Sequence, residues 1–329
     1  MSDLLQLAAA NLLSPMVLFF ALGAFASFFR SDLTIPEAIG KGLALYLMLA
    51  IGFKGGAQLA ANGATALVLV ALAAALILSF ALPVAAYALL RTFTRLQVAD
   101  AAAVAAHYGS VSVVTFVAAT GYLDGRGIRY EGFVVAMLAV METPAIVSGL
   151  LLARRGGAAL TDGGPLLSGE VIREVFLSGG VVLLAGSFAI AMATGERGLA
   201  MMAPAIGEPF SALLAVFLLD MGLLVGRRLR EFRAVGWPVI AFGLYMPLIG
   251  ATVGLLVARA IGLSEGGMTL VAVLAASASY IVVPAAMRLS LPQANPAIYV
   301  PLSLAVTFPF NLIAGIPLYH AAAQWLARP

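Results

Sequence analysis

The sequence predicts an all-α integral membrane protein with ten transmembrane helices in two inverted five-helix repeats, in which spans four and nine are crossed, broken helices. Composition supports the membrane assignment, because hydrophobic residues make up 63% of the 329 and charged residues only 10%. Soluble domains have about 45–50% and about 25%. No segment alternates polar and apolar residues over the roughly ten positions of a barrel strand, so the predicted spanning elements are helices.

Charged residues, glycines and prolines divide the apolar runs into ten predicted spans. A helix needs about 20 apolar residues to cross a bilayer, so 329 residues hold roughly ten spans. The first span lacks the basic leader and cleavage site of a signal peptide and is interpreted as a retained helix. The spans are predicted near residues 12–29, 38–53, 64–90, 99–121, 131–153, 171–194, 205–225, 236–261, 268–289 and 296–325.

The distribution of Lys and Arg predicts the orientation. Cytoplasmic ends of spans are enriched in these residues, and with the N-terminus outside most of the 18 fall on inward-facing ends. The strongest cluster is RRLREFR, Arg227–Arg233, interpreted as a topology anchor rather than a lipid or partner site. Both termini are therefore expected outside, in a bacterial inner membrane. The net charge of +3 reflects these loops, and no nucleic-acid partner is expected.

Two pairs of segments indicate an internal duplication. GSVSVVT (Gly109–Thr115) aligns with ASASYIV (Ala276–Val282), and Ala139–Gly149 aligns with Ala305–Gly315 at nearly the same shift. The predicted units are residues 1–155 as the first repeat, 156–169 as a short cytoplasmic linker and 170–329 as the second repeat. Because five spans is an odd number, the second half enters the membrane from the opposite face. Inverted repeats with corresponding interrupted helices are typical of a transporter's midplane site.

The paired S-x-S segments predict where spans four and nine are interrupted. Ser110, Ser112, Ser277 and Ser279 are weak helix formers within apolar runs. Each second half-helix would begin near the membrane centre, with Pro284 expected at a first helical position. Two helix N-termini, each with about half a positive charge, suit a small monovalent oxyanion. The alternative is that small residues only allow close helix packing.

Four polar residues are candidates for a coupling cation. The first half-helices end with carbonyls at the same depth, which suits Na⁺, and Thr115 and Glu142 are candidates to complete that site. For Glu142 the alternative is a buried acid bonded to the backbone. Asp220, inside span seven, is either a coupling residue or a partner for a neighbouring span. Asn311 is a candidate amide ligand, and His107 is interpreted as a packed core histidine rather than a proton relay.

Catalysis finds no support in the sequence. There is no HExxH zinc motif, no G-x-S-x-G elbow and no phosphate-binding loop. The chain contains no Cys, which excludes disulfides, iron–sulfur ligation and thiol chemistry. We therefore expect a protein that is not an enzyme, with no cofactor and no metal beyond a possible Na⁺.

Several of these segments resemble the sodium-dependent bicarbonate transporters known from cyanobacteria. The resemblance runs from SPMVLFFALGAFASFF through HYGSVSVVTF and METPAIV to the region AASASYIVVP, and it covers nearly the whole chain. IPEAIGKG, the two S-x-S elements and LPQANPAIY are the most specific motifs. The resemblance implies a homotrimer in the membrane lipid, with a gate domain (spans 1, 2, 6 and 7) and a core domain (spans 3–5 and 8–10).

The resemblance also implies the position of a bicarbonate site, at the crossing of spans four and nine. Carried over residue by residue, the site comprises Gly109, Ser110, Val111 and Ser112, together with Ser277, Ala278 and Ser279. Family members are inhibited by a trimeric PII-like regulator on the cytoplasmic face.

This chain departs from the cyanobacterial pattern at three places. Tyr280 stands where those proteins usually carry an acidic residue, and Val283-Pro284 stands where they have glycine-proline. Glu142 replaces a shorter aspartate. The linker Arg154–Gly169 is far shorter, which bears on the regulator. The lost acid at position 280 would move the sodium ligands to Glu142 or Asp220.

These observations predict a secondary transporter that imports bicarbonate, or a similar small anion, with Na⁺. The first alternative is a cation/proton antiporter with related broken helices, against which the acid-free S-x-S crossing argues. The second is a transport-silent sensor that binds a PII-like partner through Arg227–Arg233 and Arg154–Gly169.

Overall fold

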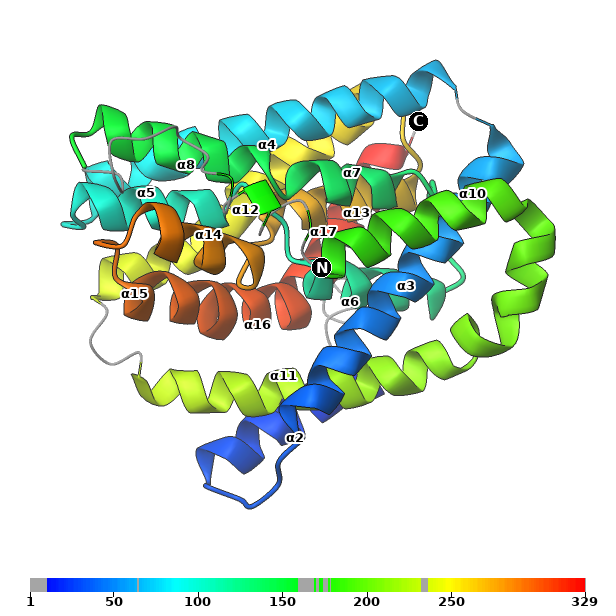
Figure 1. Ribbon diagram of the computed structural model, residues 1–329, viewed down its shortest axis with the longest axis horizontal. Helices are drawn as coiled ribbons and strands as arrows, with labels where there is room; N and C mark the ends of the chain where they lie inside the picture. The colour runs from blue at the N-terminus through cyan, green and yellow to red at the C-terminus, as the bar shows by residue number, and fades with distance from the viewer. Residues whose placement is uncertain are drawn as a thin grey trace.

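Helices are the only regular secondary structure in the part of the chain that the structure describes (Figure 1). This computed structural model describes residues 11–63, 65–158, 169, 172–173, 177, 179–231 and 236–328. The long elements are α2 (Pro15–Phe28), α3 (Glu37–Asn62), α4 (Ala66–Phe93), α5 (Val98–His107), α6 (Val113–Asp124), α7 (Val134–Met141), α8 (Pro144–Arg155), α10 (Gly179–Ile206), α11 (Pro209–Glu231), α12 (Trp237–Ala260), α13 (Glu265–Ala276), α14 (Val282–Ser290) and α17 (Ile316–Ala327).

The last predicted span is one continuous but irregular helix. It runs through α15 (Pro296–Pro301), the π-helical turn η3 (Leu302–Thr307), α16 (Phe308–Phe310), the π-helical turn η4 (Asn311–Gly315) and α17. Prolines 301, 309 and 317 lie within this stretch and remove backbone N–H donors. The wider π turns keep the helix continuous through these positions.

Seven helices in the described ranges are long and apolar enough to cross a membrane. They comprise residues 37–61, 66–93, 134–155, 179–206, 209–228, 237–260 and 296–327. The shorter apolar helices are α2, α5, α6 and α13. Three of these four are short because predicted spans four and nine are interrupted near their centres, which leaves no long uninterrupted helix at either place.

The bend between the sixth and seventh predicted spans lies inside α10 rather than in a loop. Gly195 has φ 54° and ψ −143°, a conformation essentially restricted to glycine. Beyond it the chain returns along α3, where the Tyr46 hydroxyl donates to the Ala205 carbonyl at 2.6 Å. The sixth span was predicted from residue 171, whereas α10 begins at Gly179; most of residues 171–178 lie outside the described part.

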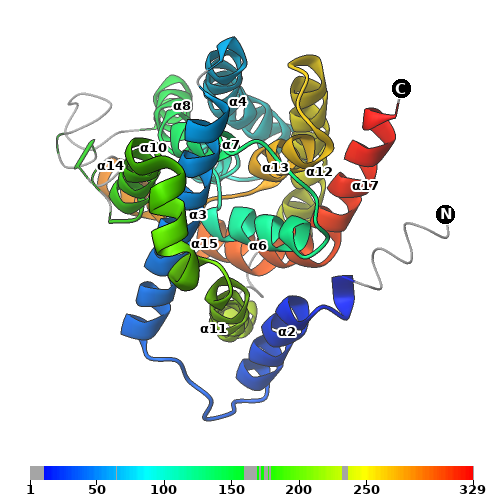
Figure 2. The same cartoon turned by 90° about the vertical axis from the view of Figure 1, so that its right-hand side faces the viewer.

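The helices pack in two sets, which lie on different sides of the molecule in Figure 2. In one set α3 packs along α10 and α2 packs along α11. In the other set α13 packs on α12 and α17, and α5 packs on α4 and α8. Contacts between the sets are fewer and include those of α6 and α7 with α3. The candidate site lies where the two sets meet.

Candidate functional site

The two interrupted helices meet at their breaks, as the sequence predicted for the interruptions. One break lies between α5 and α6, and the other lies between α13 and α14. The Ser112 N–H donates to Ser277 Oγ at 2.9 Å, and the Ser279 N–H donates to the His107 carbonyl at 2.9 Å. One backbone N–H of each break is therefore satisfied by the other break, as burial in an apolar environment requires.

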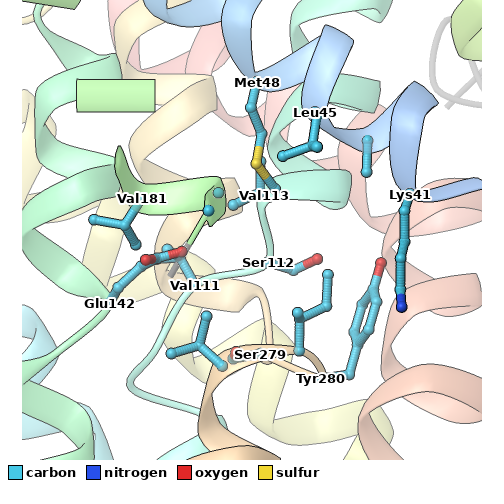
Figure 3. Close-up of a pocket in the computed structure, with 15 residues that line it drawn as sticks. Lys41, Leu45, Met48, Val111, Ser112, Val113, Glu142, Val181, Ser279 and Tyr280 are labelled. Carbon is cyan, nitrogen blue, oxygen red and sulfur yellow. The ribbon is translucent and has the colours of Figure 1, made fainter. Parts of the chain in front are cut away.

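A cavity of about 320 Å³ lies beside this meeting point (Figure 3). Its volume is at the lower end of small-molecule sites, which occupy about 300–1,000 Å³. Its walls come from both sets of helices: the two breaks, the turn after α7, and the first parts of α3 and α10. The lining residues are Lys41, Ala44, Leu45, Met48, Val111–Val113, Glu142, Gly179–Val181 and Ser279–Val282.

Two helix N-termini face this cavity, because residues 111–113 begin α6 and residues 279–282 begin α14. The first turn of a helix has N–H groups without intrahelical acceptors and a partial positive charge. Ser112 is the N-cap of α6, and its Oγ accepts from the Thr115 N–H at 3.2 Å. Ile281 caps α14 without a side-chain hydrogen bond. Pro284 was expected at the first helical position and occupies the third, which also lies in the turn that needs no N–H.

The structure separates the four predicted serines into two pairs. Ser112 and Ser279 line the cavity together with Val111. The Ser110 hydroxyl instead donates to the Glu142 carbonyl at 3.0 Å, and the Ser277 hydroxyl donates to the Leu274 carbonyl at 3.0 Å. These last two hydroxyls are therefore bonded to backbone carbonyls, and neither residue is among those that line the cavity.

The other two members of the predicted anion segments are packing residues in this structure. A Cβ atom on Gly109 would lie 2.2 Å from Pro83 Cγ and 2.9 Å from the Ser79 carbonyl oxygen. The break therefore sits directly against α4, and only glycine fits there. Ala278 is buried at 2% exposure, and neither residue is among those that line the cavity.

Glu142 reaches the cavity from the two-residue turn between α7 and α8, directly before Thr143 and Pro144. The side chain is only 5% exposed, and its Oε2 has no hydrogen-bond partner among the described residues. The hydroxyl of Thr115, on the first turn of α6, is likewise buried without a partner in that part of the chain. Unpartnered buried oxygens of this kind are costly, so both are available for a ligand.

Asn311 and Asp220 are not among the residues that line the cavity. The Asn311 amide donates to the Ala276 carbonyl at 2.9 Å, at the end of α13, and its oxygen accepts from the Tyr319 hydroxyl at 2.7 Å. Asn311, in η4, thus stabilises the break in span nine by satisfying the last carbonyl of α13. Asp220 packs against α3, since a Cβ atom on Gly40 would lie 2.4 Å from an Asp220 carboxylate oxygen.

His107 is a buried core residue, as predicted. Its Nδ1 is 2.6 Å from the Ala103 carbonyl oxygen, and its ring lies 4.7 Å from the ring of Tyr299. Nε2 has no partner among the described residues. His107 is 0% exposed and is not among the residues that line the cavity.

Two further polar residues that line the cavity, Lys41 and Tyr280, were not predicted as binding residues. Lys41 lies near the start of α3 and borders the cavity, while its side chain is 74% exposed and its ammonium lies 2.6 Å from a Glu37 carboxylate oxygen. Tyr280 was noted only for the acid it replaces. The sequence contains a feature that could have indicated each position, since Lys41 follows a helix start and Tyr280 follows an S-x-S element.

Comparison with known proteins bears on the identity of this site. The family model of the Na⁺-dependent bicarbonate transporter superfamily matches residues 15–324. No curated protein matches the chain. Within the described ranges, no group of three or more His, Cys, Asp or Glu side chains is placed to hold a metal ion.

Proposed function

Because the chain belongs to the Na⁺-dependent bicarbonate transporter superfamily, whose model covers residues 15–324, we propose that it is a secondary active transporter. It imports bicarbonate, or a similar small monovalent anion, together with Na⁺. The observation that carries this proposal is the cavity of about 320 Å³ on which the first turns of α6 and α14 converge.

The anion would bind at the two helix starts. Each N-terminus is equivalent to about half a positive charge, so the two together offset about one negative charge. Backbone N–H groups and the hydroxyls of Ser112 and Ser279 supply donors at the same wall. The two helix ends can therefore balance the charge of the anion without a cationic side chain. Binding of this kind is strong enough to select the anion and weak enough to release it.

The coupled Na⁺ would bind near Glu142 and Thr115. Sodium prefers oxygen ligands, and these two side chains carry buried oxygens without partners in the described part of the chain. Moving one anion into a cell that is negative inside costs about 2.3 kcal/mol per 100 mV. One Na⁺ carried with it cancels the charge, so the sodium concentration gradient drives uptake.

Transport would follow from movement of a core domain against a gate domain. We assign α2, α3, α10 and α11 to the gate and the remaining helices to the core, in a molecule of ten spans and two inverted repeats. The cavity supports this assignment because α3 and α10 supply one wall and both breaks supply the other. Alternating access by such rocking is the general mechanism for inverted-repeat transporters.

Assembly, orientation and regulation are further parts of the proposal. Bands of exposed apolar side chains on α2 and α4, among them Phe25, Leu69 and Ile77, suit contact with lipid or with two further copies in a homotrimer. Both termini would lie outside a bacterial inner membrane. A PII-like regulator would bind at the basic segment 227–233 and the linker 154–169. Residues 227–231 end α11, whereas the linker lies largely outside the described residues.

The test is uptake of radiolabelled bicarbonate by purified protein in proteoliposomes, with and without an inward sodium gradient. Uptake that requires the gradient supports the proposal. Uptake without sodium dependence removes the coupling, and no uptake of any small anion removes the transport function. A pH-sensitive dye inside the vesicles identifies an antiporter when sodium is added in buffer free of bicarbonate and CO₂, because only an antiporter would then change the internal pH.

A further inference from the structure

Tyr280 reaches the same cavity from the start of α14, and its hydroxyl lies beside the Ser112 side chain. It lies between Ser279 and the N-cap Ile281, and all three line the cavity. In Figure 3 its hydroxyl end points toward the Ser112 side chain, which lines the cavity from α6. Tyr280 thus extends across the cavity from one broken helix to the other.

The ring of Tyr280 is held in place by packing. It makes an edge-on contact with Phe308, with ring centres 5.8 Å apart. Its hydroxyl lies 4.0 Å from the Met221 sulfur, and thioether sulfur is a weak acceptor. Packing on Phe308 therefore fixes the orientation of the phenol ring, and the hydroxyl proton can be donated to a stronger acceptor than the Met221 sulfur.

The chemistry of the opposing group is complementary. Ser112 Oγ accepts from the Thr115 N–H, and its own O–H is directed at the Tyr280 hydroxyl oxygen. With Ser112 directed at the Tyr280 oxygen, the Tyr280 O–H is the neutral donor that this pair of half-helices offers to an anion. A carboxylate at position 280 would place a negative charge at the same wall and would repel an anion.

We propose that Tyr280 is a specificity-determining residue, whose hydroxyl donates a hydrogen bond to the bound oxyanion beside Ser112. This inference rests on the proposed function for the identity of the anion, but it concerns binding and can be tested without transport. It assigns a neutral hydroxyl donor to the anion, in addition to the helix ends, in a cavity that Lys41 and Glu142 also line.

The experiment compares wild-type protein with Tyr280→Phe, which keeps the ring and its contact with Phe308. The apparent Kd is measured from the rise in melting temperature with bicarbonate, formate and nitrate, and KM and maximal rate are measured by uptake. The matched control is Tyr245→Phe, since the Tyr245 hydroxyl is also buried, has no partner among the described residues and does not line the cavity.

For Tyr280→Phe we expect the Kd and KM for the bound anion to rise about tenfold or more, as expected for a lost hydrogen bond to a charged group. Its maximal rate and its melting temperature without anion should stay near the wild-type values. Tyr245→Phe should change neither constant.

The other possible results distinguish failure of this inference from failure of the proposed function. An unchanged Kd in Tyr280→Phe overturns the inference and leaves the proposed function intact. Wild-type protein that binds bicarbonate through Tyr280 but does not transport it overturns the proposed function alone. Wild-type protein that binds none of the three anions overturns both.

Discussion

The Lys54 ammonium nitrogen lies 3.7 Å from Asp124 Oδ2, and this ion pair joins α3 to the last residue of α6. The ammonium also lies 4.5 Å from the centre of the Phe210 ring at the start of α11. Helix α6 therefore has its first turn at the cavity and its last residue in a contact with the other set of helices. Along α3 the cavity ends at Met48, six residues, or about 9 Å, before Lys54.

We expect this contact to open during transport, because movement of the core against the gate must separate α6 from α3. With no Cys in the wild-type chain, cysteines introduced by Lys54→Cys and Asp124→Cys can be joined by a short, reducible bis-thiosulfonate reagent. Cross-linking should abolish uptake in the double variant, and reductant should restore it. The single-cysteine variants serve as controls. Full uptake by cross-linked protein would show that this contact does not have to open.

Glu142→Gln should impair sodium coupling. The substitution keeps the shape of the side chain but removes the charge from a carboxylate that lines the cavity and has an oxygen without a partner in the described residues. We expect the sodium concentration for half-maximal uptake to rise at least about tenfold, the effect of losing a charged ligand worth about 1.4 kcal/mol or more.

The matched control for that experiment is Glu196→Gln, since Glu196 is exposed near the bend of α10. Its sodium dependence should equal that of the wild type. If Glu142→Gln retains wild-type sodium dependence, Glu142 is a structural acid and the cation site lies elsewhere.

The breaks were predictable from sequence, whereas the direction of each serine was not. Gly109 and the paired S-x-S elements weaken a helix locally, and this local signal placed both interruptions. Which hydroxyl faces the cavity depends on partners distant in sequence, such as Ser112 with Ser277, 165 residues apart. No single-segment pattern contains that information.

The same limit explains the other differences. The proposed role of Tyr280 depends on the position of the start of α14 opposite Ser112, which a single sequence segment does not specify. The bend at Gly195 depends on a positive φ. A glycine within a helical pattern does not by itself predict such a conformation. Asn311 was recognisable as a polar group near a proline, but its partner, the Ala276 carbonyl, lies on another span.

Gly109→Ala should destabilise the protein by about 1–3 kcal/mol, the usual effect of overpacking. The added Cβ would meet Pro83 Cγ at 2.2 Å and the Ser79 carbonyl oxygen at 2.9 Å, so α4 or the break has to move. The measurement is the melting temperature of purified protein. Gly186→Ala is the control, because nothing lies within 4 Å of a Cβ at that position in α10. Equal melting temperatures for the two variants would contradict the close packing of the break on α4.

Asn311→Ala separates two roles for the amide, support of a helix break and ligation of sodium. The substitution leaves the Ala276 carbonyl and the Tyr319 hydroxyl without their partners, and each unsatisfied buried group costs about 1–3 kcal/mol. We therefore expect a clear fall in melting temperature. In the protein that remains folded, the sodium concentration for half-maximal uptake should stay at the wild-type value, because both amide atoms of Asn311 already have protein partners. A tenfold rise in that concentration with an unchanged melting temperature would instead identify Asn311 as a sodium ligand.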